Sequence, residues 1–220
     1  FLAREHRALA ALYGLWATDA SPTERHRLLT LAHQHLAKAT TISDIMQQHL
    51  YHEASGTFVA VNLSTGDLIE NRVYLMAFPL WGGNVPTHEA LRVAHSVLSP
   101  DMRSPYGIRS TSSNDPRYTN GNMIKPYSNW RGPVWVNANA AIAYGMNALG
   151  MHTQAQTLAL DVTATLAADL RRTATWHECY SSDSGHGLAA PGFLSWNTLG
   201  ATLAPDIAAH VDPFHIDVVV

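Results

Sequence analysis

Two tryptophans enclose an arginine, a glycine and a proline in the segment Trp130-Arg131-Gly132-Pro133-Val134-Trp135. Indole faces stack on the apolar faces of sugar rings, and a guanidinium offers a rigid fork of donors to hydroxyls or a carboxylate. Pro133 fixes the backbone, and Gly132 removes a side chain just before it. The same residues also suit a packed aromatic corner in which Arg131 forms a structural ion pair. The segment therefore predicts either a sugar-binding wall or such a corner.

A second candidate is the carboxylate of Glu178, which lies between aromatic residues in Trp176-His177-Glu178-Cys179-Tyr180. An aromatic wall raises a carboxyl pKa by desolvation, and a nearby arginine lowers it, so such a group is tunable for proton transfer. Taken alone, a solvent-facing glutamate at the start of a loop is the commoner interpretation.

Metal and cofactor chemistry has no strong sequence signal. His177, Cys179 and His186 match none of the usual zinc spacings. We find no phosphate-binding loop and no nucleophile elbow. We therefore predict no metal site and no cofactor.

Helical periodicity dominates the elements that must position these residues, and it predicts an all-α chain. Helices are expected at about 2–16, 22–39, 42–50, 88–98, 138–149, 153–172 and 196–207. Ser21-Pro22-Thr23-Glu24 reads as a capping box with proline at the first helical position. The intervening stretches 52–86, 99–133 and 173–194 are long, aromatic and rich in glycine. Such unequal loops favour a toroid of helical hairpins whose loops at one end form a cleft.

Composition limits the partners. Hydrophobic residues make up 46% of the chain and charged residues 14%, the profile of a globular protein. The formal net charge of −3, without a basic stripe, argues against nucleic acid or an anionic membrane as a partner. The single cysteine leaves the compartment unknown, with a cytoplasmic one favoured. Because the chain opens with Phe1 and no signal peptide is visible, we expect it to be a fragment of a longer protein.

Six segments, taken together and in order, resemble the C-terminal region of glycoside hydrolase family 63, over about residues 51–203. They are Pro79-Leu80-Trp81, Gly107-Ile108-Arg109-Ser110, Asp115-Pro116-Arg117-Tyr118, Asn129-Trp130-Arg131-Gly132-Pro133-Val134-Trp135, Glu178-Cys179-Tyr180 and Phe193-Leu194-Ser195-Trp196. The string Trp-Arg-Gly-Pro-Val-Trp is the most specific of them.

The resemblance implies an (α/α)6 barrel and an inverting glycosidase that acts on an α-linked glucosyl or mannosyl substrate. It places the general base at Glu178. It also implies that Trp130, Arg131 and Trp135 form the wall that contacts substrate, and that Trp81, Tyr180 and Trp196 contribute to it. In an inverting enzyme the two carboxyl groups stand roughly 6.5–9.5 Å apart, which leaves room for a water.

The family's acid motif is not found here, and the chain has too few helices for a complete barrel. We therefore expect residues 1–220 to be the C-terminal portion of the catalytic barrel domain, with the acid supplied upstream. Two alternatives remain: a truncated or degenerate sugar-binding relative, and a trehalase-like hydrolase of the same clan. An open barrel would expose the stripe Leu158, Val162 and Leu166, so we expect self-association or dependence on a missing N-terminal half.

Overall fold

The computed structural model describes residues 1–82, 85–121 and 129–215, and seven α-helices account for most of them. The helices are α1 (Leu2–Thr18), α2 (Pro22–Leu50), α3 (Phe78–Gly82), α4 (Thr87–Val97), α5 (Val136–Ala148), α6 (His152–Thr173) and α7 (Leu199–Ala208). Two 3-10 helices, η1 (Tyr74–Ala77) and η2 (Ser195–Thr198), precede α3 and α7. The predicted all-α class is confirmed.

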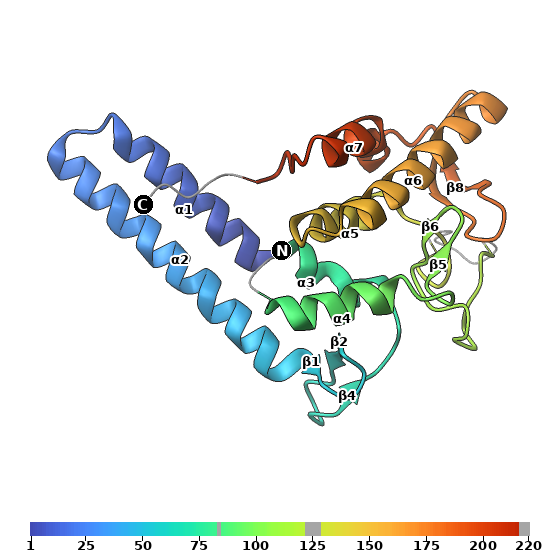
Figure 1. Ribbon diagram of the computed structural model, residues 1–220, viewed down its shortest axis with the longest axis horizontal. Helices are drawn as coiled ribbons and strands as arrows, with labels where there is room; N and C mark the ends of the chain where they lie inside the picture. Colours follow the sequence, from blue (N-terminus) through green and yellow to red (C-terminus); the bar gives the residue numbers. More distant parts are fainter. Residues whose placement is uncertain (83–84, 122–128, 216–220) are drawn as a thin grey trace.

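Helices α1 and α2 form a long antiparallel hairpin at one end of the molecule (Figure 1). The face of α1 that packs on α2 is made of small residues, among them Ala3, Ala10 and Ala17. These alanines recur every seventh residue, and their small side chains let the two helix axes approach closely. The apolar face that periodicity suggested is not the buried one, because Leu2 and Trp16 are exposed.

Helix α2 is one continuous helix of 29 residues, where two shorter helices were expected. Pro22 occupies the first turn, as predicted, since its missing N–H has no partner there in any case. The predicted capping box is wrong. Ser21 makes no side-chain capping bond, and the Glu24 carboxylate instead accepts hydrogen bonds from Arg27 on the next turn.

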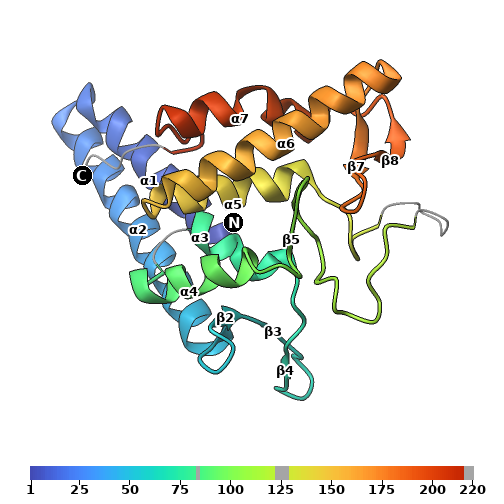
Figure 2. The same ribbon diagram turned by 45° about the vertical axis from the view of Figure 1, so that its right-hand side comes forward.

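Helix α5 lies at the centre of the remaining helices. Helix α5 contacts α3 and α7. Helix α6 lies against both α5 and α7, and α4 lies against α3 (Figures 1 and 2). Nearly every residue of α5 is buried, which is expected for a helix that is apolar on all sides. Helices α3 and α5 are so close that a Cβ on Gly145 would stand 2.8 Å from the backbone of Leu80.

The stripe expected to be exposed on α6 is in fact buried. Leu158, Val162 and Leu166 all belong to the main hydrophobic core, which α5 and α7 share. The neighbouring helices of this chain therefore cover the apolar face of α6 by themselves. Within the described ranges, no helix is both long enough and apolar enough to cross a membrane.

The strands are short antiparallel hairpins that shape the connections between helices. They are β1 (Tyr51–His52) with β2 (Thr57–Phe58), β3 (Ala60–Val61) with β4 (Leu68–Ile69), β5 (Arg103–Ser104) with β6 (Gly107–Ile108), and β7 (His177–Tyr180) with β8 (Gly187–Pro191). The hairpin β7–β8 follows the C-terminal end of α6, and the segment that contains β5 and β6 lies at the same end of the helices (Figure 2). The described parts of the loops 99–133 and 173–194 therefore lie at one end of the helices, whereas the hairpins β1–β2 and β3–β4, which fall largely in the expected loop 52–86, lie beside the C-terminal end of α2 (Figures 1 and 2).

Candidate functional site

The two motifs singled out in the sequence are hydrogen-bonded neighbours. Val134 and Tyr180 exchange backbone hydrogen bonds of 2.8 and 3.0 Å, so the segment around Trp135 forms an isolated bridge with strand β7. A second bridge joins Val134 to Arg109, just after β6. Glu178 and the tryptophan pair are therefore brought together by main-chain pairing, although more than 40 residues separate them in sequence.

A stack of tryptophans forms one side of the site. The rings of Trp130 and Trp135 lie 3.5 Å apart and almost parallel, at 8°. Trp196 tilts against Trp135 at 5.7 Å. The Trp135 indole N–H donates to the Asn129 carbonyl at 3.0 Å. Trp135 is only 1% exposed, whereas Trp130 is 38% exposed. Trp130 is therefore the exposed ring of this stacked pair, and Trp135 is the buried one.

Glu178 lies opposite a β-bulge. His177 pairs with Pro191 and Cys179 pairs with Leu188, so one residue of β7 faces two residues of β8, Ala189 and Ala190. Bulges of this kind re-aim side chains and are common next to active sites. Ala189 has a φ of 60°, a left-handed conformation that a residue with a Cβ adopts at a cost.

Glu178 as a whole residue is partly buried, and its backbone is held by the tryptophan wall. The Trp196 indole N–H donates to the Glu178 carbonyl at 3.2 Å. Across 1–82, 85–121 and 129–215, no hydrogen bond or ion pair engages the Glu178 side chain itself. A carboxylate without a protein partner is free to accept a proton from a bound water.

Arg131 is also exposed, and no described residue forms an ion pair with its guanidinium, unlike the expectation for a packed aromatic corner. Its backbone is fixed on both sides, because Thr119 donates to its carbonyl at 2.8 Å and its N–H donates to the Asn129 side chain at 2.9 Å. A Cβ on Gly132 would stand 2.6 Å from the Thr119 carbonyl oxygen, so this position requires glycine.

Tyr180 and Trp81 lie further from this wall. Tyr180 is 1% exposed and belongs to the main core, where burial raises the pKa of its phenol well above the ordinary value. Its side chain therefore supports the site and presents no surface to a ligand. Trp81 is on α3, where the Arg4 guanidinium lies over its ring at 4.2 Å.

A continuous run of aromatic rings connects the tryptophan stack with a cavity between the inner helices. Tyr74 stacks on Trp130 at 5.6 Å, and Phe78 contacts Tyr74 edge-on at 5.2 Å. Tyr74, Phe78 and Trp81 then line a cavity of about 460 Å³ that α5 and α7 also border. This apolar, aromatic lining is typical of a binding site for a small organic molecule.

No metal site is evident in the described ranges, where no three histidine, cysteine or carboxylate side chains lie together. Burial raises the pKa of the Cys179 thiol to about 12, so it stays protonated at neutral pH and is a poor metal ligand.

The chain is similar to proteins of known family. Residues 3–196 match the model of the mannosylglycerate hydrolase MGH1-like glycoside hydrolase domain. The chain belongs to this family. The match covers both the helices and the two motifs that form the candidate site.

Curated relatives of this MGH1-like domain agree with the predicted resemblance to family 63. A probable mannosyl-oligosaccharide glucosidase of Schizosaccharomyces pombe is 28% identical over 139 residues, which are 57% of this chain and 17% of that protein. The mannosylglycerate hydrolase of Thermus thermophilus is 25% identical over 148 residues, 67% of this chain and 33% of that protein. The MGH1-like chain thus spans a third or less of the length of these relatives.

Solved structures confirm the predicted barrel fold. A family 63 mannosylglycerate hydrolase from Thermus thermophilus, in complex with glucose, superposes with a TM-score of 0.64 at 24% identity. That match covers 91% of this chain and 44% of the other. The neutral trehalase Nth1 of Saccharomyces cerevisiae has a TM-score of 0.69 at 14% identity, covering 96% and 39%. The MGH1-like chain therefore has the fold of part of an (α/α)6 barrel.

Sequence reasoning missed three residues of the site in this MGH1-like chain. Tyr74, which stacks on Trp130, lies in a segment that was expected to be a loop. Asn197 donates to the carbonyls of His177 and Phe193. Asp169 is a fully buried carboxylate on α6. Only Asp169 carried a usable signal, because it lies one turn after Leu166 on the apolar stripe of its helix.

Proposed function

We propose that this chain carries the general base of an inverting glycoside hydrolase, with Glu178 as that base. The substrate class we propose is an α-linked glucoside or mannoside. Residues 1–220 then form the C-terminal portion of the catalytic barrel domain. The general acid is a carboxylic acid supplied by a part of the barrel outside this chain.

In this mechanism Glu178 takes a proton from a water molecule on the ring face opposite the leaving group. The water oxygen forms a bond to the anomeric carbon as the bond from that carbon to the leaving oxygen breaks. The leaving oxygen receives a proton from the general acid. The product sugar is released with inverted anomeric configuration, and neither a metal nor a cofactor takes part.

The observation that carries this proposal is the pairing of an unengaged carboxylate with an exposed indole. Glu178 has no side-chain partner within the described part of the chain, and the adjacent stack presents Trp130 to solvent. A sugar ring that stacks on Trp130 gains apolar contact. The guanidinium of Arg131, which has no ion-pair partner among the described residues, can then donate hydrogen bonds to sugar hydroxyls or to a carboxylate of the aglycone.

The remaining candidate residues have supporting roles in this proposal. Trp135 backs the Trp130 ring, and Trp196 packs on Trp135 and donates to the Glu178 carbonyl. Tyr180 anchors β7 in the core. Trp81 lines the adjacent cavity, which would receive the part of the substrate beyond the cleaved bond.

The test uses the product of the complete gene with a panel of α-glucosides, α-mannosides, glucosylglycerate and mannosylglycerate. Proton NMR of the first product formed distinguishes the mechanisms. An α-linked substrate should give the β-sugar first, which then mutarotates. Release of the α-sugar first would contradict inversion. No turnover of any substrate would favour the degenerate sugar-binding alternative.

A further inference from the structure

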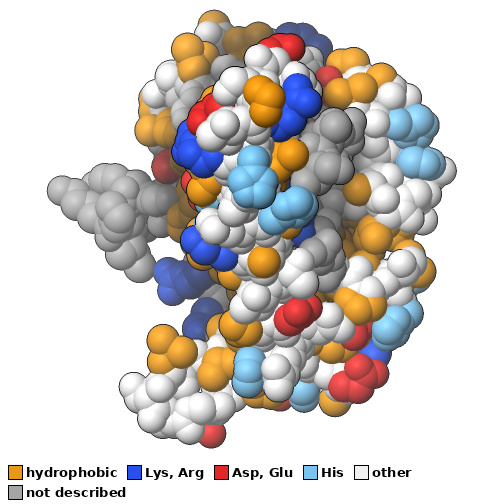
Figure 3. All heavy atoms as spheres, turned by 90° about the vertical axis from the view of Figure 1, so that its left-hand side faces the viewer, with side chains coloured by type: hydrophobic (Ala, Val, Ile, Leu, Met, Phe, Trp, Pro, Cys, Tyr) orange, Lys and Arg blue, Asp and Glu red, His pale blue; other side chains and the backbone are white. Residues whose placement is uncertain are grey.

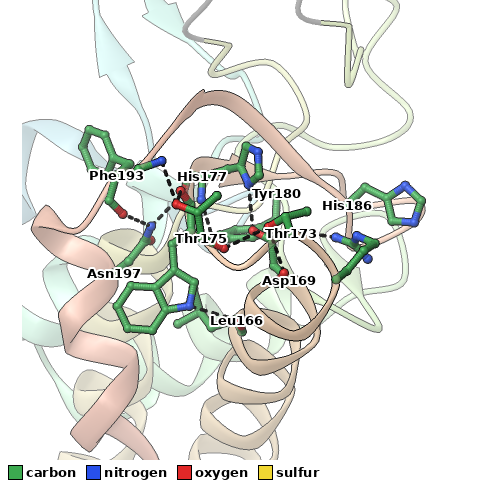
Figure 4. Close-up of polar contacts among 12 residues, drawn as sticks. Leu166, Asp169, Thr173, Thr175, His177, Tyr180, His186, Phe193 and Asn197 are labelled. Carbon is green, nitrogen blue, oxygen red and sulfur yellow. Dashed lines mark hydrogen bonds and ion pairs between the residues drawn. The ribbon is translucent and has the colours of Figure 1, made fainter.

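A buried carboxylate lies directly behind the strand that carries Glu178. Asp169, near the C-terminal end of α6, is 0% exposed, yet polar side chains reach both of its carboxylate oxygens (Figure 4). Arg172 donates at 2.9 Å to one oxygen, and His177 Nδ1 lies 2.8 Å from the other. A buried charge is tolerated only when its oxygens are well paired, as they are here.

The Asp169 carboxylate determines the orientation of the His177 ring and which ring nitrogen donates to it. An ionised carboxylate only accepts hydrogen bonds, so the proton of this contact is on His177 Nδ1. The ring lies over Gly187 of β8, where a Cβ would stand 2.2 Å from Nδ1. The missing side chain of Gly187 thus makes room for the imidazole, and the carboxylate holds it in a single orientation.

The backbone around Glu178 is held from the opposite direction by two consecutive residues of η2. Asn197 donates to the His177 carbonyl at 2.7 Å, and Trp196 donates to the Glu178 carbonyl at 3.2 Å. The side chain of His177 is tied to α6, and its carbonyl is tied to η2. The residue immediately before Glu178 is therefore anchored at both ends.

From this arrangement we infer that Asp169 and His177 are positioning residues for Glu178, an inference that rests on the proposed function. The Asp169–His177 bond sets the position of β7 and, with the bulge opposite, the direction of the Glu178 carboxylate. Misplacement of a catalytic group by about 1 Å costs about 100-fold in rate. Neither residue needs to touch the substrate to have this effect.

The first experiment compares two replacements that differ in where they place an N–H donor. In His177→Asn the side-chain amide nitrogen lies close to the former Nδ1 and can still donate to Asp169. In His177→Gln the nitrogen lies where Nε2 was. We expect His177→Asn to keep kcat within about 3-fold of the parent, and His177→Gln to lower kcat about 10- to 100-fold with KM nearly unchanged.

His186 supplies the matched control, because it is an exposed histidine on the turn of the same β7–β8 hairpin (Figure 4). His186→Gln should match the parent. Thermal unfolding checks that all variants fold. Equal kcat for His177→Asn and His177→Gln would overturn the role of the Nδ1 donor.

The decisive step is a double-mutant cycle in the background of Glu178→Ala, with azide added as an external nucleophile. Azide fills the space of the lost carboxylate and attacks the anomeric carbon directly. If His177 acts only through Glu178, His177→Gln should not change this azide-dependent rate. A further loss of 10-fold or more, on the order of the loss in the parent background, would reveal a general structural role and contradict the inference.

The two proposals fail in different ways. A parent that is active, with Glu178→Ala equally active, would sink the proposed function and with it the inference. An active parent that depends on Glu178 but tolerates His177→Gln would sink the inference alone. Turnover lost in Glu178→Ala and in His177→Gln, but restored in His177→Asn, supports both.

Discussion

Trp130 differs from the other tryptophans of the stack because its ring remains accessible. Trp135, which stacks on Trp130, is buried, and Tyr74 of η1 also stacks on Trp130. Since the stack is preformed, little conformational entropy is lost in ordering the indole when a ligand binds there. This residue is therefore the part of the wall that we expect to contribute directly to affinity.

Replacing Trp130 with alanine should raise KM about 10-fold while kcat changes much less, because ring stacking contributes roughly 1 kcal/mol beyond area burial. Trp16 on α1 is the matched control, since it is 60% exposed and lies outside the site. Steady-state kinetics on the best substrate of the panel measures both variants. A Trp130→Ala variant with the KM of Trp16→Ala would rule out the stacking role.

At this scale the sequence predicted residue types better than their partners. Trp130 and Glu178 could be selected from local pattern, because aromatic and carboxylate side chains indicate their chemistry by type alone. The burial of side chains around them could not be predicted from residue type in the same way. Whether Trp135 faces solvent depends on Asn129 and Trp196, and whether Asp169 is paired depends on His177. Such contacts exist only once the helices have packed.

The hairpin β7–β8 is the element on which the site depends most. Its register is fixed by the His177 ring above Gly187 and by the bulge at Ala189. A slip of one residue would turn Glu178 to the opposite face of the hairpin. The bridge from Val134 to Tyr180 adds a second constraint from the tryptophan segment.

Gly187→Ala tests this element. The new Cβ would overlap the His177 ring, so we expect a loss of about 1–3 kcal/mol in the free energy of unfolding, as in other overpacked sites. Gly82→Ala is the control, because no atom of the described residues beyond its chain neighbours lies within 4 Å of its Cβ position. Urea unfolding followed by circular dichroism measures the difference. Equal stability of the two variants would show that β7 adjusts freely around His177.

Element boundaries were predicted well where the local signal was complete. Helix α5 ends where Gly150 was expected to cap it, with Gly150 at a φ of 78°. The short hairpin β5–β6 was not separated from loop, because two-residue strands are too short for a periodic pattern. The alanine face of α1 was missed because small residues carry little hydrophobic contrast.

The surface of the whole molecule retains an apolar region between the α1–α2 hairpin and the β-hairpins that follow it. Phe1, Ile45 and Leu75 are each more than half exposed and line a cavity of about 570 Å³. At the outer end of the hairpin, hydrophobic side chains are instead interspersed with histidine and charged ones (Figure 3). The exposed apolar region is therefore on the cavity side, and the stripe of α6 that was expected to be exposed does not contribute to it.

We expect the chain on its own to self-associate through this region, because contiguous apolar surface of this kind drives association. Ile45→Lys and Leu75→Lys should each shift the chain toward the monomer. Leu160→Lys on α6 is the control, since Leu160 is 52% exposed and does not line the cavity. Light scattering over a range of concentrations measures the masses. A parent chain that stays monomeric throughout would contradict the expectation.

The central claim is that Glu178 is the general base, and Glu178→Gln tests it most directly. The amide keeps the shape of the side chain and cannot take the proton of the water. With the complete gene product and the best α-linked substrate, the account predicts a fall in kcat of about 100-fold or more, with KM and the unfolding temperature nearly unchanged. A Glu178→Gln variant that turns over substrate at the parent rate would contradict the assignment.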